Sequence, residues 1–133
     1  MRVRFLLLPT LVVAVAFTGP DRDAPREPKF ATIAGACTPS ENPSVQPAQV
    51  LMTRADNVEW RDPSGRATSW VITPKDPERW PFPSSIAGSP QGPANSGAPS
   101  AGAAAGVYSY NVTITCGDGT TQVIDPDIII GEN

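Results

Sequence analysis

Cys37 and Cys116 are the residues of this 133-residue chain with the most definite chemistry. An even pair of cysteines in an exported protein normally forms a disulfide. Such a bond would close a loop of about 80 residues and would stabilise the fold by roughly 4 kcal/mol in the chain-entropy description. The alternative is a pair of free thiols that bind a soft metal or react in redox chemistry.

The chain contains no histidine. This absence excludes proton transfer by imidazole, activation of a serine or cysteine nucleophile by histidine, and imidazole ligation of a metal. No nucleophile with a partner base remains to support a hydrolase. We therefore expect a protein that is not an enzyme, with no catalytic residue, no metal site and no cofactor.

Three aspartates, Asp118, Asp125 and Asp127, are the remaining candidates for a calcium site or an acid/base pair. Calcium takes six to eight oxygen ligands, and the sequence has no Asp-x-Asp-x-Asp loop with a later glutamate. Asp118 suits a hairpin turn, and Pro126 between the other two indicates a strand kink or bulge. These residues are therefore predicted to shape turns.

Trp80 and Phe82 are the aromatic residues that stand apart from the expected strands, because prolines surround them and a charged segment, 75–79, precedes them. One hypothesis is that they form an exposed contact patch. The alternative is that they anchor a loop over one end of the fold. Trp60 and Trp70, by contrast, occupy inward positions of expected strands and are predicted to lie in the core.

Short apolar runs separated by turn residues predict the elements that must position these side chains. The expected strands are 30–37, 45–54, 57–61, 66–73, 107–116 and 120–130. Apolar and polar residues alternate almost perfectly in 107–116, as in a half-buried strand, and 117–119 supplies a hairpin loop. With no segment of helical period, the pattern predicts an all-β sandwich or barrel.

A long stretch rich in proline, glycine, alanine and serine, at about 83–106, interrupts this pattern. Loops of that length inside a domain are either functional or flexible. We expect a flexible loop, because the segment has few of the aromatic or charged groups that recognition uses.

The first 16 residues are predicted to be a signal peptide, with a basic start at Arg2 and Arg4, an apolar run and cleavage after Ala16. Such a run is too short to cross a membrane. A disordered linker at 17–29 and a β-sandwich domain at 30–133 would follow. The protein is therefore expected to be extracytoplasmic (secreted, periplasmic or in the cell envelope), with membrane contact only during export; the alternative is a buried core helix of a cytosolic domain.

The formal net charge is -3, from 10 basic and 13 acidic side chains, and loss of residues 1–16 would remove two basic side chains and no acidic one. The mature protein would be mildly acidic. This argues against nucleic acid as a partner, since its capture uses a clustered basic face.

The segment from Asn57 onward resembles the cupredoxin fold of plastocyanin-like proteins, through two motifs at 57–60 (NVEW) and 106–111 (GVYSYN). The resemblance implies that Val112 stands where the family has its copper-ligating cysteine and that about Thr68 stands where it has its first histidine. Blue copper requires two imidazoles and a thiolate, and Met52 is the only thioether besides Met1. The resemblance therefore implies the cupredoxin fold for this chain but not the copper site of the family.

Taken together, we expect an antiparallel β-sandwich of cupredoxin-like or immunoglobulin-like type after the signal peptide and linker. Its expected function is that of a non-catalytic binding or structural module with an unknown protein or surface partner. The alternative is a redox or metal-handling cupredoxin relative that uses Cys37 and Cys116. A thiol count together with a copper titration distinguishes the two.

Overall fold

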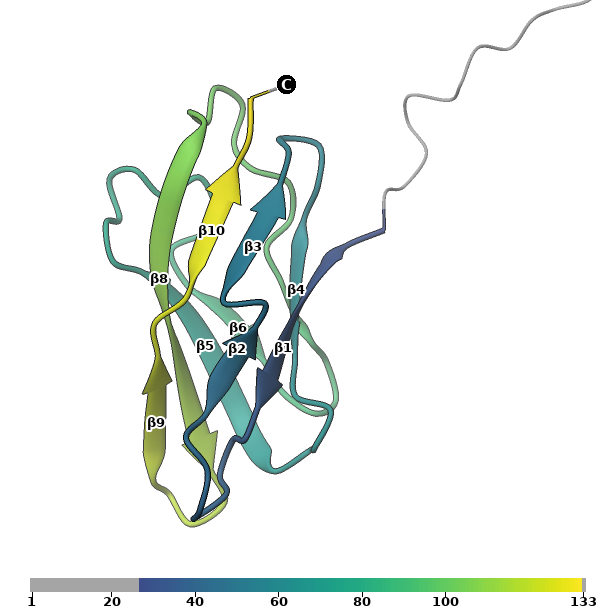
Figure 1. The fold of residues 1–133 in the computed structure, drawn as a ribbon, viewed down its shortest axis with the longest axis vertical. Helices are drawn as coiled ribbons and strands as arrows, with labels where there is room; N and C mark the ends of the chain where they lie inside the picture. The colour runs from purple at the N-terminus through teal and green to yellow at the C-terminus, as the bar shows by residue number, and fades with distance from the viewer. Residues whose placement is uncertain (1–26, 133) are drawn as a thin grey trace, which may run out of the picture.

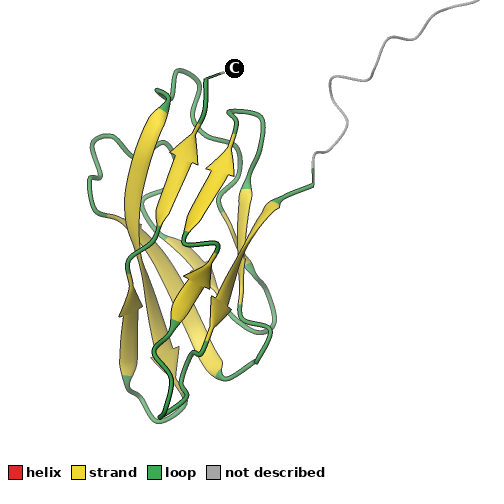
Figure 2. Cartoon of the chain, in the orientation of Figure 1, coloured by secondary structure: helices red, strands yellow, loops and turns green. Residues whose placement is uncertain are grey.

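The computed structural model describes residues 27–132, and within them the chain forms ten strands and no helix (Figure 2). The predicted signal peptide and most of the predicted linker lie outside this range. The strands are β1 (Lys29–Ala34), β2 (Ser44–Gln46), β3 (Gln49–Met52), β4 (Val58–Arg61), β5 (Ala67–Pro74), β6 (Ile86–Gly88), β7 (Ala94–Asn95), β8 (Gly106–Cys116), β9 (Thr121–Ile124) and β10 (Asp127–Ile130). The all-β prediction is confirmed.

Two sheets face each other (Figure 1). The smaller sheet has the order β2-β1-β4-β7, and the larger has the order β3-β10-β8-β5-β6, with β9 paired beside β8. The sheets are mixed, because β1 pairs with β4 and β3 pairs with β10 in parallel, while the other pairs are antiparallel. The expectation of purely antiparallel sheets is therefore corrected.

Two of the predicted strands are each divided at a proline. The predicted strand 45–54 is β2 and β3, which belong to different sheets, with Pro47 between them. The predicted strand 120–130 is β9 and β10, with Pro126 between them. Proline has no N–H for a sheet ladder, so strands end or bend there. The kink expected at Pro126 is confirmed.

The predicted loop at about 83–106 contains two short edge strands that were not predicted, β6 and β7. β6 pairs with β5 and β7 pairs with β4, so this stretch closes one edge of each sheet. Ile86 and Ala94 are buried and join the loop to the core. After β7 the chain returns across the fold, where Ser100 N donates to Pro81 O at 2.8 Å.

The core between the sheets is centred on β8. Its inward residues are buried along the whole strand, as the alternation predicted: Tyr108, Tyr110, Val112, Ile114 and Cys116. Trp60 from β4 and Trp70 from β5 are also buried, which confirms their predicted core positions. Trp60 Nε1 donates to the Tyr110 hydroxyl at 3.0 Å and ties the two sheets together.

Tyr110→Phe is expected to lower the free energy of unfolding by about 1–3 kcal/mol, because the buried Trp60 N–H loses its acceptor. Urea unfolding measures the change. The exposed Thr121→Val is the control, because loss of its hydroxyl breaks no hydrogen bond of this kind. Equal stability of the Tyr110 variant and the wild type would contradict the role of this bond.

Burial raises the pKa of the Tyr110 hydroxyl above its ordinary value of 10.0; the hydrogen bond from Trp60 acts in the opposite direction and the Asp127 charge adds to the increase. The unfolded chain therefore loses this proton at lower pH than the folded protein does. The contribution to stability is complete below about pH 10 and falls as the pH rises beyond it. Absorbance titration should show the Tyr110 hydroxyl ionising at higher pH in the folded protein than in urea.

No helix in the described range is long and apolar enough to span a membrane.

Candidate functional site

The disulfide joins Cys37, in the β1–β2 loop, to Cys116 at the end of β8, with an S–S distance of 2.02 Å and a Cα–Cα distance of 5.6 Å. The predicted pairing is confirmed. No free cysteine occurs between residues 27 and 132. The bond fastens the smaller sheet to the longest strand of the larger one.

An open pocket of about 490 Å³ lies beside this disulfide; its lining includes Thr38 of the β1–β2 loop, Arg66 of the β4–β5 turn and Gln122 of β9. Gln122 Oε1 accepts a hydrogen bond from Cys37 N at 2.8 Å, and Cys37 has a φ of 57°, in the left-handed region. Arg66 donates to the Thr38 hydroxyl at 3.0 Å. Gln122 and Arg66 thus hold the chain around the disulfide in place, and their hydrogen bonds are made within the protein.

The three aspartates do not form one site. Asp118 lies in the β8–β9 turn, where its carboxylate accepts hydrogen bonds from the Thr120 hydroxyl and N–H, and these bonds lower its pKa. Asp125 pairs with Lys75 at 2.5 Å, and Asp127 accepts a hydrogen bond from Ser109. Across the described part of the chain, no three His, Cys, Asp or Glu side chains gather as they would around a metal ion.

The two residues proposed as a contact patch differ in exposure. Phe82 is buried, at 8% exposure, while Trp80 is partly buried and packs against the core. The Trp80 ring lies 5.1 Å from Phe82 and 5.9 Å from Tyr110, between centroids, and its Nε1 donates to Pro83 O at 2.9 Å. This is the arrangement of a loop anchor, and Phe82 has little area to offer a partner.

Trp80 also borders a recess of about 110 Å³ that includes Val107, Tyr108 and Arg79. The Arg79 guanidinium lies over the Tyr108 ring, 5.5 Å from its centroid. The recess therefore joins the Trp80 loop to the outer face of β8. Val107 is the apolar residue at this junction.

An apolar row crosses the outer face of the larger sheet at this point. Leu51 of β3, Ile129 of β10 and Val107 of β8 are neighbours in register. Leu51 is 66% exposed and Val107 is 50% exposed, while Ile129 between them is partly buried. We call Leu51, Ile129 and Val107 the apolar ladder.

The apolar ladder was not among the predicted sites, although the sequence contains a signal for it. Both β3 and β10 have consecutive apolar residues where a strand with one solvated face would alternate. Inward Val50 and Ile128 account for the core, so the residues beside them must point to solvent.

The two positions that the cupredoxin resemblance places at copper ligands have ordinary roles. Val112 is buried in the core, and exposed Thr68 donates its hydroxyl to Thr115 O at 2.9 Å. Met52 is also buried.

Comparison of the chain with protein-family models, with curated proteins and with solved structures gives no match.

Proposed function

We propose that this protein is a non-catalytic extracytoplasmic module that binds a protein partner through the apolar ladder. The observation that carries the proposal is the exposure of Leu51 and Val107 on either side of the partly buried Ile129, on three neighbouring strands. Single exposed apolar residues are common, whereas a contiguous patch is typical of interaction sites. The recess beside Val107 adds Arg79, and arginine and aromatic residues are enriched at interfaces.

The proposed sandwich type is cupredoxin-like. Immunoglobulin sandwiches of the constant type are built from antiparallel sheets, and this chain has two parallel pairs. The two motifs that carry the resemblance lie on β4 with the residue before it and on the first half of β8, which are central strands of the two sheets. The two motifs that resemble the cupredoxin family therefore lie on strands that build the core of the fold.

The proposed location rests on the disulfide, because such bonds persist in oxidising compartments outside the cytosol. It agrees with the predicted signal peptide.

Leu51→Lys combined with Val107→Lys is expected to weaken partner binding by about a hundredfold, since two desolvated apolar contacts are replaced by charges. The purified protein serves as bait for the native envelope fraction, and the recovered partner is then titrated. Val123→Lys is the matched control, because Val123 is 61% exposed on β9, beside the other half of β8, and lies outside the ladder.

The proposal requires that the wild type and the Val123 variant retain one partner that the double variant loses. Equal recovery by all three proteins, or a partner lost only with the Val123 variant, would refute the ladder as the contact surface. Unfolding curves for all three show whether the variants remain folded.

A further inference from the structure

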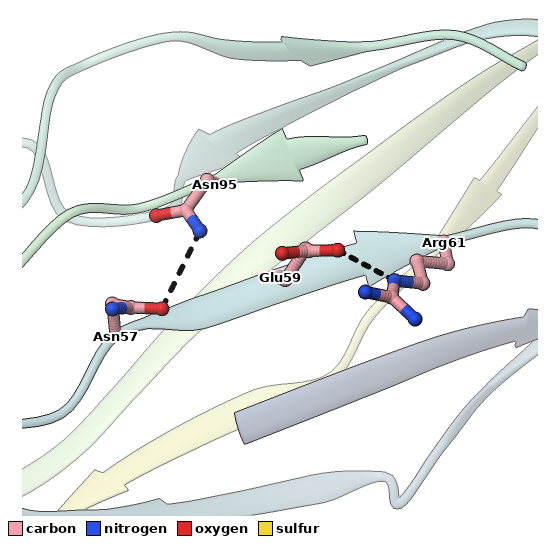
Figure 3. Close-up of polar contacts among 4 residues, drawn as sticks. All are labelled: Asn57, Glu59, Arg61 and Asn95. Atoms are coloured by element: carbon pink, nitrogen blue, oxygen red, sulfur yellow. Dashed lines mark hydrogen bonds and ion pairs between the residues drawn. The ribbon is translucent and has the colours of Figure 1, made fainter. Parts of the chain in front are cut away.

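The outer face of the smaller sheet carries planar polar side chains in a row (Figure 3). Asn57 precedes β4, Glu59 and Arg61 follow at alternate positions on it, and Asn95 lies opposite Glu59 on β7. Asn95 Nδ2 donates to Asn57 Oδ1 at 3.4 Å, and Arg61 Nε donates to Glu59 Oε1 at 2.5 Å. Amide, carboxylate and guanidinium groups are thus presented together.

An exposed aromatic ring borders this row. Phe30 of β1 is in register with Glu59 and is 44% exposed. The Arg61 guanidinium lies over the Phe30 ring, 4.1 Å from its centroid. Because this contact holds Arg61 next to the ring, apolar and polar groups adjoin at one place on the sheet.

A pocket of about 310 Å³ opens at Glu59 and Arg61. Its lining includes Ser89, Pro90 and Pro93 from the connection between β6 and β7. Two proline rings supply apolar surface, and Ser89 supplies a hydroxyl. The volume is at the small end of the range for ligand pockets, so it suits a ligand of about one ring.

Trp70 also lines this pocket, and its indole N–H has no hydrogen-bond partner. Trp70 is 1% exposed, and its Nε1 is the only such buried side-chain nitrogen or oxygen in the described range. The other two tryptophans donate to Tyr110 and to Pro83 O. Buried donors are almost always paired, so this one indicates an acceptor that the chain itself does not supply.

We propose that this pocket binds one sugar unit of a neutral glycan. A sugar hydroxyl accepts from an N–H such as that of Trp70 and also donates to a carboxylate such as that of Glu59. The C–H faces of a sugar ring pack on apolar rings such as those of Pro90 and Pro93. The binding site lies on the sheet opposite the apolar ladder and does not depend on the proposed protein partner.

The charges of the site favour a neutral ligand over an ionic one. The positive charge of Arg61 is balanced by Glu59. The Asp62 carboxylate, which also lines the pocket, accepts hydrogen bonds from the N–H groups of Ser64 and Ala67 and is engaged in the β4–β5 turn. An anion would have to displace Glu59, and a cation would meet Arg61.

The three indole N–H resonances of the ¹⁵N-labelled protein provide the test. The protein is titrated with the methyl glycosides of glucose, galactose and mannose and with N-acetylglucosamine, at millimolar concentrations. Glycerol, sodium acetate and trialanine are the comparison probes. We expect the Trp70 resonance to move downfield with at least one sugar and the Trp60 and Trp80 resonances to stay in place.

Two variants and a matched control locate the effect. Glu59→Ala is expected to weaken the sugar by about tenfold or more, because it removes a charged hydrogen-bond acceptor. Glu78→Ala is the matched control, since Glu78 is exposed in the β5–β6 loop and does not line the pocket. Trp70→Phe keeps an aromatic ring but lacks the N–H donor. Because its indole resonance is lost, sugar binding to this variant is followed through the Arg61 Nε resonance.

A Trp70 resonance that no sugar moves would overturn the proposal. A response to glycerol, acetate or trialanine without a response to any sugar would also overturn it. A sugar response that Glu59→Ala and Glu78→Ala leave equally strong would place binding elsewhere and refute this pocket.

Discussion

Removal of the Cys37–Cys116 disulfide is expected to lower the free energy of unfolding by about 4 kcal/mol. The bond joins residues 79 apart in sequence, so it restricts a large part of the unfolded chain. It also holds the β1–β2 loop against the end of β8, where Gln122 pairs with the Cys37 N–H. A domain of about a hundred residues has a modest core, and a loss of this size is a large share of its stability.

Urea unfolding with and without a reducing agent measures this effect in the wild-type protein. The Cys37→Ala, Cys116→Ala double variant repeats it without a reductant and should not respond when one is added. A thiol count on the denatured, unreduced wild type should find no free thiol from this pair. Two free thiols, or identical unfolding midpoints, would contradict the structural role of the bond.

The same material tests the alternative function. A redox or metal-handling protein that used Cys37 and Cys116 would bind copper in its reduced form and would develop a visible absorbance band. We expect no such band in either form, because the chain has no imidazole to complete the ligand set.

Local sequence patterns predicted the features that depend on neighbouring residues. The strict alternation in 107–116 gave β8 and its buried face, and Pro126 gave the break before β10. The disulfide was predictable because the chain has two cysteines and an export signal was inferred from its first residues. Each of these inferences needed only the local sequence or a count.

Features that depend on distant partners were not predictable in this way. The run 45–54 has the composition of one strand, yet β2 pairs with β1 and β3 pairs with β10, near the end of the chain. The chain passes from one sheet to the other between β2 and β3, and the parallel pairs β1–β4 and β3–β10 result from this crossing. Strand composition does not state which strand a segment will pair with, so the sheet order could not be derived from it.

The candidate sites show the same limit. Phe82 was grouped with Trp80 because both lie among prolines, but Phe82 is buried in the core, where it packs against the Trp80 ring. The apolar ladder needs the register of three strands, and the Trp70 pocket needs the approach of the β6–β7 connection to β4 and β5. Side-chain types were visible in the sequence, whereas their neighbours were not.

Gly88→Ala is expected to destabilise the fold by about 3 kcal/mol, near the upper end of the usual range for overpacking. A Cβ at Gly88 would lie 2.3 Å from Trp70 Nε1 and 2.7 Å from Ala94 N. The first neighbour is a buried ring and the second is backbone of β7, so neither can move without disturbing a sheet edge. Urea unfolding measures the loss, and the near-ultraviolet circular dichroism of the tryptophans reports displacement of the indole.

Gly92→Ala, in the connection that follows β6, is the matched control, because a Cβ there meets nothing within 4 Å. It should be neutral or slightly stabilising, since alanine restricts the unfolded chain. Similar unfolding curves for the two variants would show that Trp70 has room to move and that the close packing of Gly88 does not fix it. A large difference would mean that β6 holds the indole, because the only change at Gly88 is a methyl group directed at that ring. The Trp70 indole would then be held beside the pocket by packing alone, without a hydrogen bond from the chain.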